Sequence, residues 1–251
     1  MINSAVQFDR ANSLTSQPSL HPNPAGARSI PAATALFGAY DLVAVVSLKT
    51  RQDRRAALDR DLSREGLTVE YFDALVTDAA GPFLKVGSHG AFLSHLQLLT
   101  SAGQAKKSIL ILQDDCLFLS RQTLAINPRR YDLFYGGWKA MDLGPVKQSR
   151  LVGAHCMGFS AIAACEAAKY LQAAYRKWRL GDPILPPIDG LLRNFYQSRP
   201  DLTVGFKKVA TQRCSRSDIS PSRFDSYPVA RRLIAVARRL KSAWKQRSAI
   251  I

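Results

Sequence analysis

The sequence predicts an α/β protein built on a parallel sheet, and three observations support this fold class. Residues 41–48 and 108–112 are short aliphatic runs, which are typical of strands buried on both faces. A helical pattern follows the first run, with Leu58 and Leu62 four residues apart on one face. Strands that alternate with helices along a chain favour a parallel sheet with helical crossovers.

The composition fits a globular protein with an anionic partner. The chain has 251 residues, of which 47% are hydrophobic and 22% charged, enough for one large domain or two small ones. Its net charge of +16 indicates nucleic acid, a phosphorylated ligand or an acidic membrane surface as partner. The four cysteines form no CxxC pair, which favours a reducing, cytoplasmic compartment. No apolar run is long enough for a transmembrane helix.

Three segments are expected along the chain. Residues 1–38 are rich in Ser, Pro, Asn and Ala and are predicted to be a disordered leader. Residues 39–226 carry the alternating pattern and are predicted to be the folded domain. Residues 227–251 are predicted to be a basic amphipathic tail helix, because basic residues dominate there and no acid occurs from 229 onward.

A basic loop follows the first predicted strand. It contains Lys49, Arg51, Arg54 and Arg55, and a helix is expected to begin within it and to end at about residue 64. A strand, a basic loop and a helix N-terminus together favour phosphate binding, because cations and free backbone amides face the same anion. The alternative is a solvated, charged helix face, which the alternation of Arg and Asp also favours.

The second predicted strand covers residues 67–72, and a glycine-containing loop at 81–90 leads to a helix at 91–102. His95 lies three residues after Phe92 and so borders the apolar stripe of that helix. A histidine in such a place is usually a hydrogen-bonded structural residue. Ser94 is open to two interpretations, packing or ligand binding.

Two adjacent carboxylates, Asp114 and Asp115, follow the aliphatic run at 108–112. Ligands bind at this end of strands in open α/β sheets. Like charges side by side repel unless something positive lies between them, and hard divalent cations prefer carboxylate oxygens. The stretch therefore predicts either a metal site or a solvated turn.

Later segments continue the alternation, with a glycine-rich strand at 151–160 that contains His155. Asp189 follows Pro187 at the start of a helix, where it is either a helix cap or a catalytic base. Further strands are expected at 132–138 and 202–206, and a further helix at 162–175.

The tail has an apolar side with Trp244 at its end and a basic side opposite. Such a helix suits an anionic lipid surface. The alternatives are a helix packed on the domain and a nucleic-acid arm. Nucleic acid is disfavoured, because single-strand binders interleave aromatic with basic residues, and Trp244 is the one aromatic residue from 229 onward.

Several of these motifs together resemble glycosyltransferase family 25, which includes bacterial lipopolysaccharide galactosyltransferases and collagen galactosyltransferases. The resemblance covers about residues 41–220. It is carried, in order, by residues 46–49 with 53–55, 72–74, 87–95, 110–115, His155, 187–189 and 217–219.

The resemblance implies a GT-A fold, with one twisted, mostly parallel sheet, and an inverting, metal-dependent transfer of a hexose, typically galactose from UDP-galactose. The acceptor would be a cell-surface glycan or lipopolysaccharide. If that acceptor is carried on a lipid, the basic tail predicts that the enzyme meets it at the inner face of the membrane. Manganese or magnesium would lie on Asp115, helped by Asp114. Asp189 would be the base at the acceptor hydroxyl, and His155 is a second candidate for contact with the acceptor or the metal. The UDP-sugar would meet Lys49, Arg51, Arg54, Arg55, Ser94 and His95.

Three positions depart from the family's pattern. Ser88 and Gln113 stand where the family has acids, and Ala91 stands where it has Cys. With Gln113 neutral, metal binding rests on Asp114 and Asp115. The alternative function is a catalytically impaired relative that binds a nucleotide sugar or glycan without transfer.

Overall fold

The computed structural model describes residues 31–119, 127–140, 151–179, 184–214, 236–238 and 240–244. Six strands form one sheet in the order β2-β1-β3-β6-β5-β7. They are β1 (Leu42–Ser47), β2 (Glu70–Asp73), β3 (Ile109–Gln113), β5 (Leu133–Ala140), β6 (Leu151–Phe159) and β7 (Val204–Phe206). The pairs β1–β2, β1–β3 and β5–β7 are parallel, whereas β6 is antiparallel to both its neighbours. The predicted mostly parallel sheet flanked by helices is confirmed.

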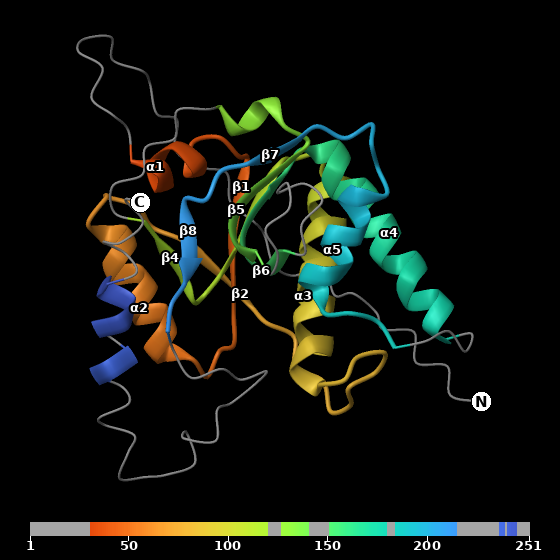
Figure 1. Ribbon diagram of the computed structural model, residues 1–251, viewed down its shortest axis with the longest axis horizontal. Helices are drawn as coiled ribbons and strands as arrows, with labels where there is room; N and C mark the ends of the chain where they lie inside the picture. The colour runs from red at the N-terminus through yellow and green to blue at the C-terminus, as the bar shows by residue number, and fades with distance from the viewer. Residues whose placement is uncertain are drawn as a thin grey trace.

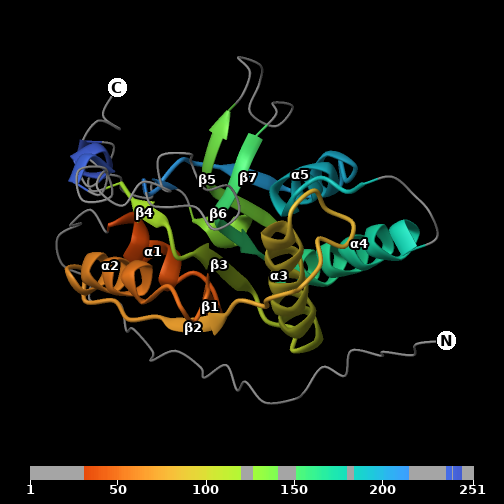
Figure 2. The same cartoon turned by 90° about the horizontal axis from the view of Figure 1, so that it is seen from below.

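Helices cover both faces of this sheet (Figures 1 and 2). One face packs against α3 (Val86–Gln104), α4 (Ala161–Arg179) and α5 (Ile188–Gln197). The other packs against α1 (Ala32–Phe37), α2 (Gln52–Ser63) and a small antiparallel sheet of β4 (Cys116–Phe118) and β8 (Ala210–Gln212). A short 3-10 helix, Pro128–Arg130, precedes β5.

Burial of β3 on both faces explains its aliphatic run. Ile109 and Ile111 face the core on the α3 side, whereas Leu110 and Leu112 face the core on the α2 side. All four side chains are fully buried. Such a strand needs an apolar residue at every position, and the polar residues begin only where the strand ends, at Gln113.

The folded part begins earlier than the composition predicts. Helix α1 lies inside the expected leader, and Ala32, Ala33, Leu36 and Phe37 are buried in the second core. The low-complexity composition around Pro31 hides these four apolar residues, which have the spacing of one helix face. The remainder of the expected leader, residues 1–30, lies outside the described residues.

Helix α3 also begins earlier than expected, because residues 87–90 form its first turns and not a loop. Tertiary packing accounts for this glycine-containing start. A Cβ on Gly90 would overlap the carbonyl oxygen of Leu75, so only glycine lets the 74–77 segment lie against the helix. His89 binds the carbonyl of Ala79 and the hydroxyl of Tyr175, which fixes the same turn.

Gly158 offers a test of the close contact between β6 and the segment before β1. A Cβ there would overlap the phenol of Tyr40, which is buried. Gly158→Ala is therefore expected to lower the free energy of unfolding by about 1–3 kcal/mol. Urea denaturation measures this change.

The matched control is Gly38→Ala. Gly38 is exposed, has φ −74°, and an added Cβ would meet only ordinary contact at 3.5 Å. This variant should be neutral or more stable by about 0.4–1 kcal/mol. Equal destabilisation by the two variants would contradict the proposed packing.

Candidate functional site

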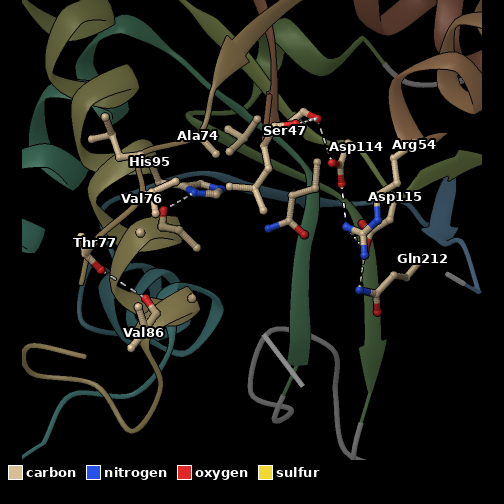
Figure 3. Close-up of a pocket in the computed structure, with 17 residues that line it drawn as sticks. Ser47, Arg54, Ala74, Val76, Thr77, Val86, His95, Asp114, Asp115 and Gln212 are labelled. Carbon is tan, nitrogen blue, oxygen red and sulfur yellow. Dashed lines mark hydrogen bonds and ion pairs between the residues drawn. The ribbon is translucent and has the colours of Figure 1, made fainter. Parts of the chain in front are cut away.

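A cavity of about 360 Å³ opens at the carboxyl ends of β1 and β3 (Figure 3). Its polar wall is formed by Ser47, Arg54, Gln113, Asp114, Asp115 and Gln212. Its opposite wall comes from the 74–77 segment and from α3. The position agrees with the general rule that ligands bind outside the carboxyl ends of strands in open α/β sheets.

Asp114 is held by two side chains that use both of its carboxylate oxygens. Ser47 Oγ donates to Oδ2 at 2.9 Å, and Arg54 Nη1 donates to Oδ1 at 2.8 Å. Burial raises the pKa of Asp114, and the Arg54 guanidinium opposes this shift without overcoming it. Asp114 is thus a fixed, buried group that orients Arg54.

Asp115 has a different set of neighbours. Its Oδ2 accepts a hydrogen bond from Gln212 Nε2 at 2.8 Å, and Arg54 Nη1 lies 3.8 Å from the same oxygen. Its Oδ1 is buried and has no hydrogen-bond partner among the described residues. Burial raises the pKa of Asp115 against the opposing effect of Arg54. One acceptor oxygen therefore stays available to a ligand.

These two carboxylates fit a divalent cation unequally. Asp115 Oδ1 is an open, buried carboxylate oxygen of the kind that Mn²⁺ or Mg²⁺ prefers. Asp114 would have to give up its hydrogen bond from Arg54 or from Ser47 before it could bind the metal. Among the described residues, no group of three or more His, Cys, Asp or Glu side chains could hold a metal ion. These two residues therefore offer a cation one carboxylate oxygen, Asp115 Oδ1, because Ser47 and Arg54 already occupy both oxygens of Asp114.

Of the four basic residues predicted to bind the donor, only Arg54 lines this cavity. Arg51 is paired with Asp53 by hydrogen bonds of 2.8 and 2.9 Å. Arg55 binds Asp73 at 2.5 Å. Lys49 is exposed.

The two predicted residues of α3 have separate positions. Ser94 Oγ accepts a hydrogen bond from the amide of Leu75 at 2.9 Å and donates to the carbonyl of Gly90 at 2.8 Å. It fixes the 74–77 segment and is not among the residues that line the cavity. His95 does line the cavity, is 1% exposed, and uses Nδ1 to bind the carbonyl of Ala91 at 2.8 Å.

A second cavity of about 720 Å³ adjoins the first and shares Ala91, Gln113 and Gln212 with it. Asp189 lies at the start of α5, as its place after Pro187 predicts, and it lines this second cavity. Its Oδ2 accepts from the amide of Gly153 at 2.8 Å, and its Oδ1 accepts from the amide of Gly190 at 3.0 Å. These bonds orient the carboxylate and leave further lone pairs for a ligand.

His155 lies beside Gly153 but lines neither cavity. Its side chain is 3% exposed and packs so closely against β5 that a Cβ on Gly137 would overlap the imidazole. The structure therefore brings Asp189, but not His155, to the space beside the acidic pair.

Gln212 and Ser47 belong to this site but escape detection in the sequence. Gln212 reaches Asp115 because β8 pairs with β4, and each of these strands has only three residues. Runs that short give no usable periodicity. Ser47 ends β1, and its parallel pairing with β3 places it beside Asp114.

Comparison with known proteins does not identify the family. No protein-family model matches the chain, and no curated protein matches it. The resemblance to glycosyltransferase family 25 thus remains an interpretation of the motifs.

Two solved structures of sugar-nucleotide enzymes show a distant likeness. One is a nucleoside-diphosphate-sugar pyrophosphorylase from Vibrio cholerae RC9, with 13% identity, coverage of 78% of this chain and 85% of that chain, and a TM-score of 0.37. The other is a putative glucose-1-phosphate thymidylyltransferase from Bacillus anthracis in complex with sucrose, with 10% identity, coverage of 78% and 75%, and a TM-score of 0.32. Likenesses this weak carry no argument about activity, and the fold rests on the strand pairings.

The effect of pH on stability tests whether the buried carboxylate of Asp115 destabilises the folded protein at neutral pH. The folded pKa of Asp115 lies above its unfolded value, so its contribution to stability is full below the unfolded pKa and is lost as pH rises through the folded pKa. Asp115→Asn removes that destabilising effect. The variant should be more stable than the wild type at neutral pH, on the order of 1 kcal/mol, and the difference should vanish in acid.

Thermal unfolding across pH measures this difference. Asp201→Asn is the control with the opposite sign, because Arg199 lowers the pKa of Asp201 and its contribution to stability is lost as pH falls. A lower free energy of unfolding for Asp115→Asn than for the wild type at neutral pH would show that the ionised carboxylate stabilises the fold.

Proposed function

We propose that this protein is a glycosyltransferase that transfers a hexose, galactose by the motif resemblance, from a UDP-sugar to a glycan acceptor with inversion. The observation that carries the proposal is the pair of adjoining cavities at one edge of the sheet. One contains Asp114, Asp115 and Arg54, and the other contains Asp189. A donor site and an acceptor site that share a border are what a direct displacement requires.

The first cavity would hold the donor. Among the described residues that line this cavity, Arg54 is the one with a positive charge, and its guanidinium contacts both Asp114 and Asp115. We expect this guanidinium to bind the diphosphate of the donor. A divalent ion on Asp115 would neutralise charge that develops on the leaving diphosphate. Asp114 and Ser47 hold Arg54 in place, and Gln212 orients Asp115.

The second cavity would hold the acceptor. Inversion in one displacement requires a base that takes the proton of the attacking hydroxyl. Asp189 suits this role because its carboxylate is oriented by two backbone amides and faces the cavity that borders the donor site. His155 does not reach either cavity, so Asp189 is preferred for this role.

Asp189→Asn tests the assignment of the base. With UDP-hexose, manganese and a panel of glycan acceptors, the variant should lower kcat by about 10²- to 10⁴-fold while the KM for the donor changes little. Release of UDP measures both constants. Asp201→Asn should leave kcat unchanged, because Asp201 is an exposed carboxylate in an ion pair with Arg199 and lines neither cavity.

The second candidate function, binding without transfer, is favoured by Gln113, a neutral residue that borders both cavities. It predicts that the wild type binds UDP-sugar but releases no UDP under any of these conditions. Turnover that depends on manganese and on Asp115 would exclude it.

We further propose that the tail binds an anionic membrane surface and holds the enzyme beside a lipid-linked or lipopolysaccharide acceptor, at the cytoplasmic face. Residues 236–238 and 240–244 are helical, and Val236, Leu240 and Trp244 form an exposed stripe at 53%, 67% and 66%. Ser242 is buried, and its Oγ accepts a hydrogen bond from the amide of Cys214. The contact through Ser242 and the exposure of the stripe support a tail helix whose apolar side is directed to solvent. The rest of the tail lies outside the described residues. None of the described helices is long and apolar enough to cross a membrane.

A full-length variant with Val236→Ser, Leu240→Ser and Trp244→Ser tests the membrane proposal. Co-sedimentation with phosphatidylglycerol-containing vesicles should fall at least about tenfold, because the apolar contribution to interfacial binding is removed. The control is Ile162→Ser, an exposed apolar residue on α4 with 69% exposure. Equal binding of the triple variant and the wild type would overturn the proposal.

A further inference from the structure

The imidazole of His95 has one nitrogen whose role is fixed by its partner. Nδ1 lies 2.8 Å from the carbonyl oxygen of Ala91, one turn earlier in α3. A carbonyl oxygen only accepts hydrogen bonds, so Nδ1 must carry the proton. In the neutral ring, Nε2 is then an acceptor.

The surroundings of His95 keep the ring neutral. The side chain is 1% exposed, and burial lowers its pKa. Asp189 acts in the opposite direction but contributes less than burial does. Nε2 is buried and has no hydrogen-bond partner among the described residues. A buried acceptor without a partner is unfavourable, and a ligand that donates a hydrogen bond to it would remove this cost.

The position of His95 tells which part of a ligand would reach it. Figure 3 shows His95 on the same side of the cavity as Val76 and Val86, with Asp114, Asp115 and Arg54 on the other side. The end beside His95 therefore carries Val76, Val86 and the hydroxyl of Thr77, which donates to the carbonyl of Ala79, and the other end is charged. A nucleotide has the same polarity, with a flat base at one end and phosphates at the other.

We propose that His95 Nε2 is a specificity contact for the nucleobase, which accepts a hydrogen bond from the ring N3–H of a uracil-type base. The inference rests on the proposed donor site and names how that site would select its nucleotide. Cytosine has an acceptor at N3, so two lone pairs would face each other. Discrimination is expected because a buried polar group rejects a ligand that leaves it unpaired.

Binding of three nucleotides to the full-length protein tests the inference. By calorimetry, the wild type should bind UMP about 10- to 100-fold more tightly than CMP or N3-methyl-UMP, both of which lack the N3–H. His95→Phe keeps a ring of similar size without an acceptor, and should reduce the affinity for UMP to that for CMP. Val86→Ala, at the same end of the cavity, should weaken all three nucleotides by the same factor.

The outcomes separate this inference from the proposed transfer. Equal affinity of the wild type for UMP, CMP and N3-methyl-UMP overturns the contact, and this comparison requires no variant to fold. Equal weakening of UMP and CMP by His95→Phe also overturns it, because Nε2 would then meet a sugar hydroxyl. If the protein selects UMP but releases no UDP from UDP-hexose, the His95 contact stands and the proposed transfer is rejected. If the protein transfers a hexose but does not select UMP, the transfer stands and the His95 contact is rejected. Absence of any nucleotide binding rejects both.

Discussion

The ion pair between Arg54 and Asp114 is the interaction on which the candidate site depends. Arg54 comes from α2 and Asp114 from the turn after β3, so the 2.8 Å contact ties the first helix after β1 to the middle of the sheet. Both groups are buried, and a buried pair is worth little net stability yet is costly to break. Its value lies in position, because it holds a cation at the wall of the cavity and leaves Asp115 Oδ1 open.

This arrangement changes the interpretation of the acidic pair. Two carboxylates side by side predict a metal site or a turn, and the structure shows a turn between β3 and β4 whose charges are partly neutralised by the protein's own arginine. Asp114 and Asp115 are therefore not equivalent. Asp114 positions Arg54, whereas Asp115 has an oxygen, Oδ1, that could bind a cation or accept a hydrogen bond from a ligand.

The six strands of the main sheet are predictable from the sequence to within a few residues, because an unbroken aliphatic run such as 109–112 is typical of a strand that is buried on both faces. The three-residue strands β4 and β8 are not predictable in this way. The sequence placed Asp189 at a helix start and His95 beside the core correctly. It could not predict that Arg51 and Arg55 are paired with Asp53 and Asp73, since the geometry of ion pairs depends on the fold. Helix α1, the early start of α3 and the contact from Gln212 were missed because tertiary packing, not local propensity, determines them.

The most direct test of Asp115 as a cation ligand is the affinity for UDP with and without Mn²⁺, in the wild type and in Asp115→Ala. We expect Mn²⁺ to tighten UDP binding to the wild type, and we expect Asp115→Ala to lose this effect while it keeps the metal-free affinity that Arg54 supports. UDP binding that is the same in both proteins, with or without Mn²⁺, would contradict the assignment of Asp115 as the cation ligand of a nucleotide-sugar site.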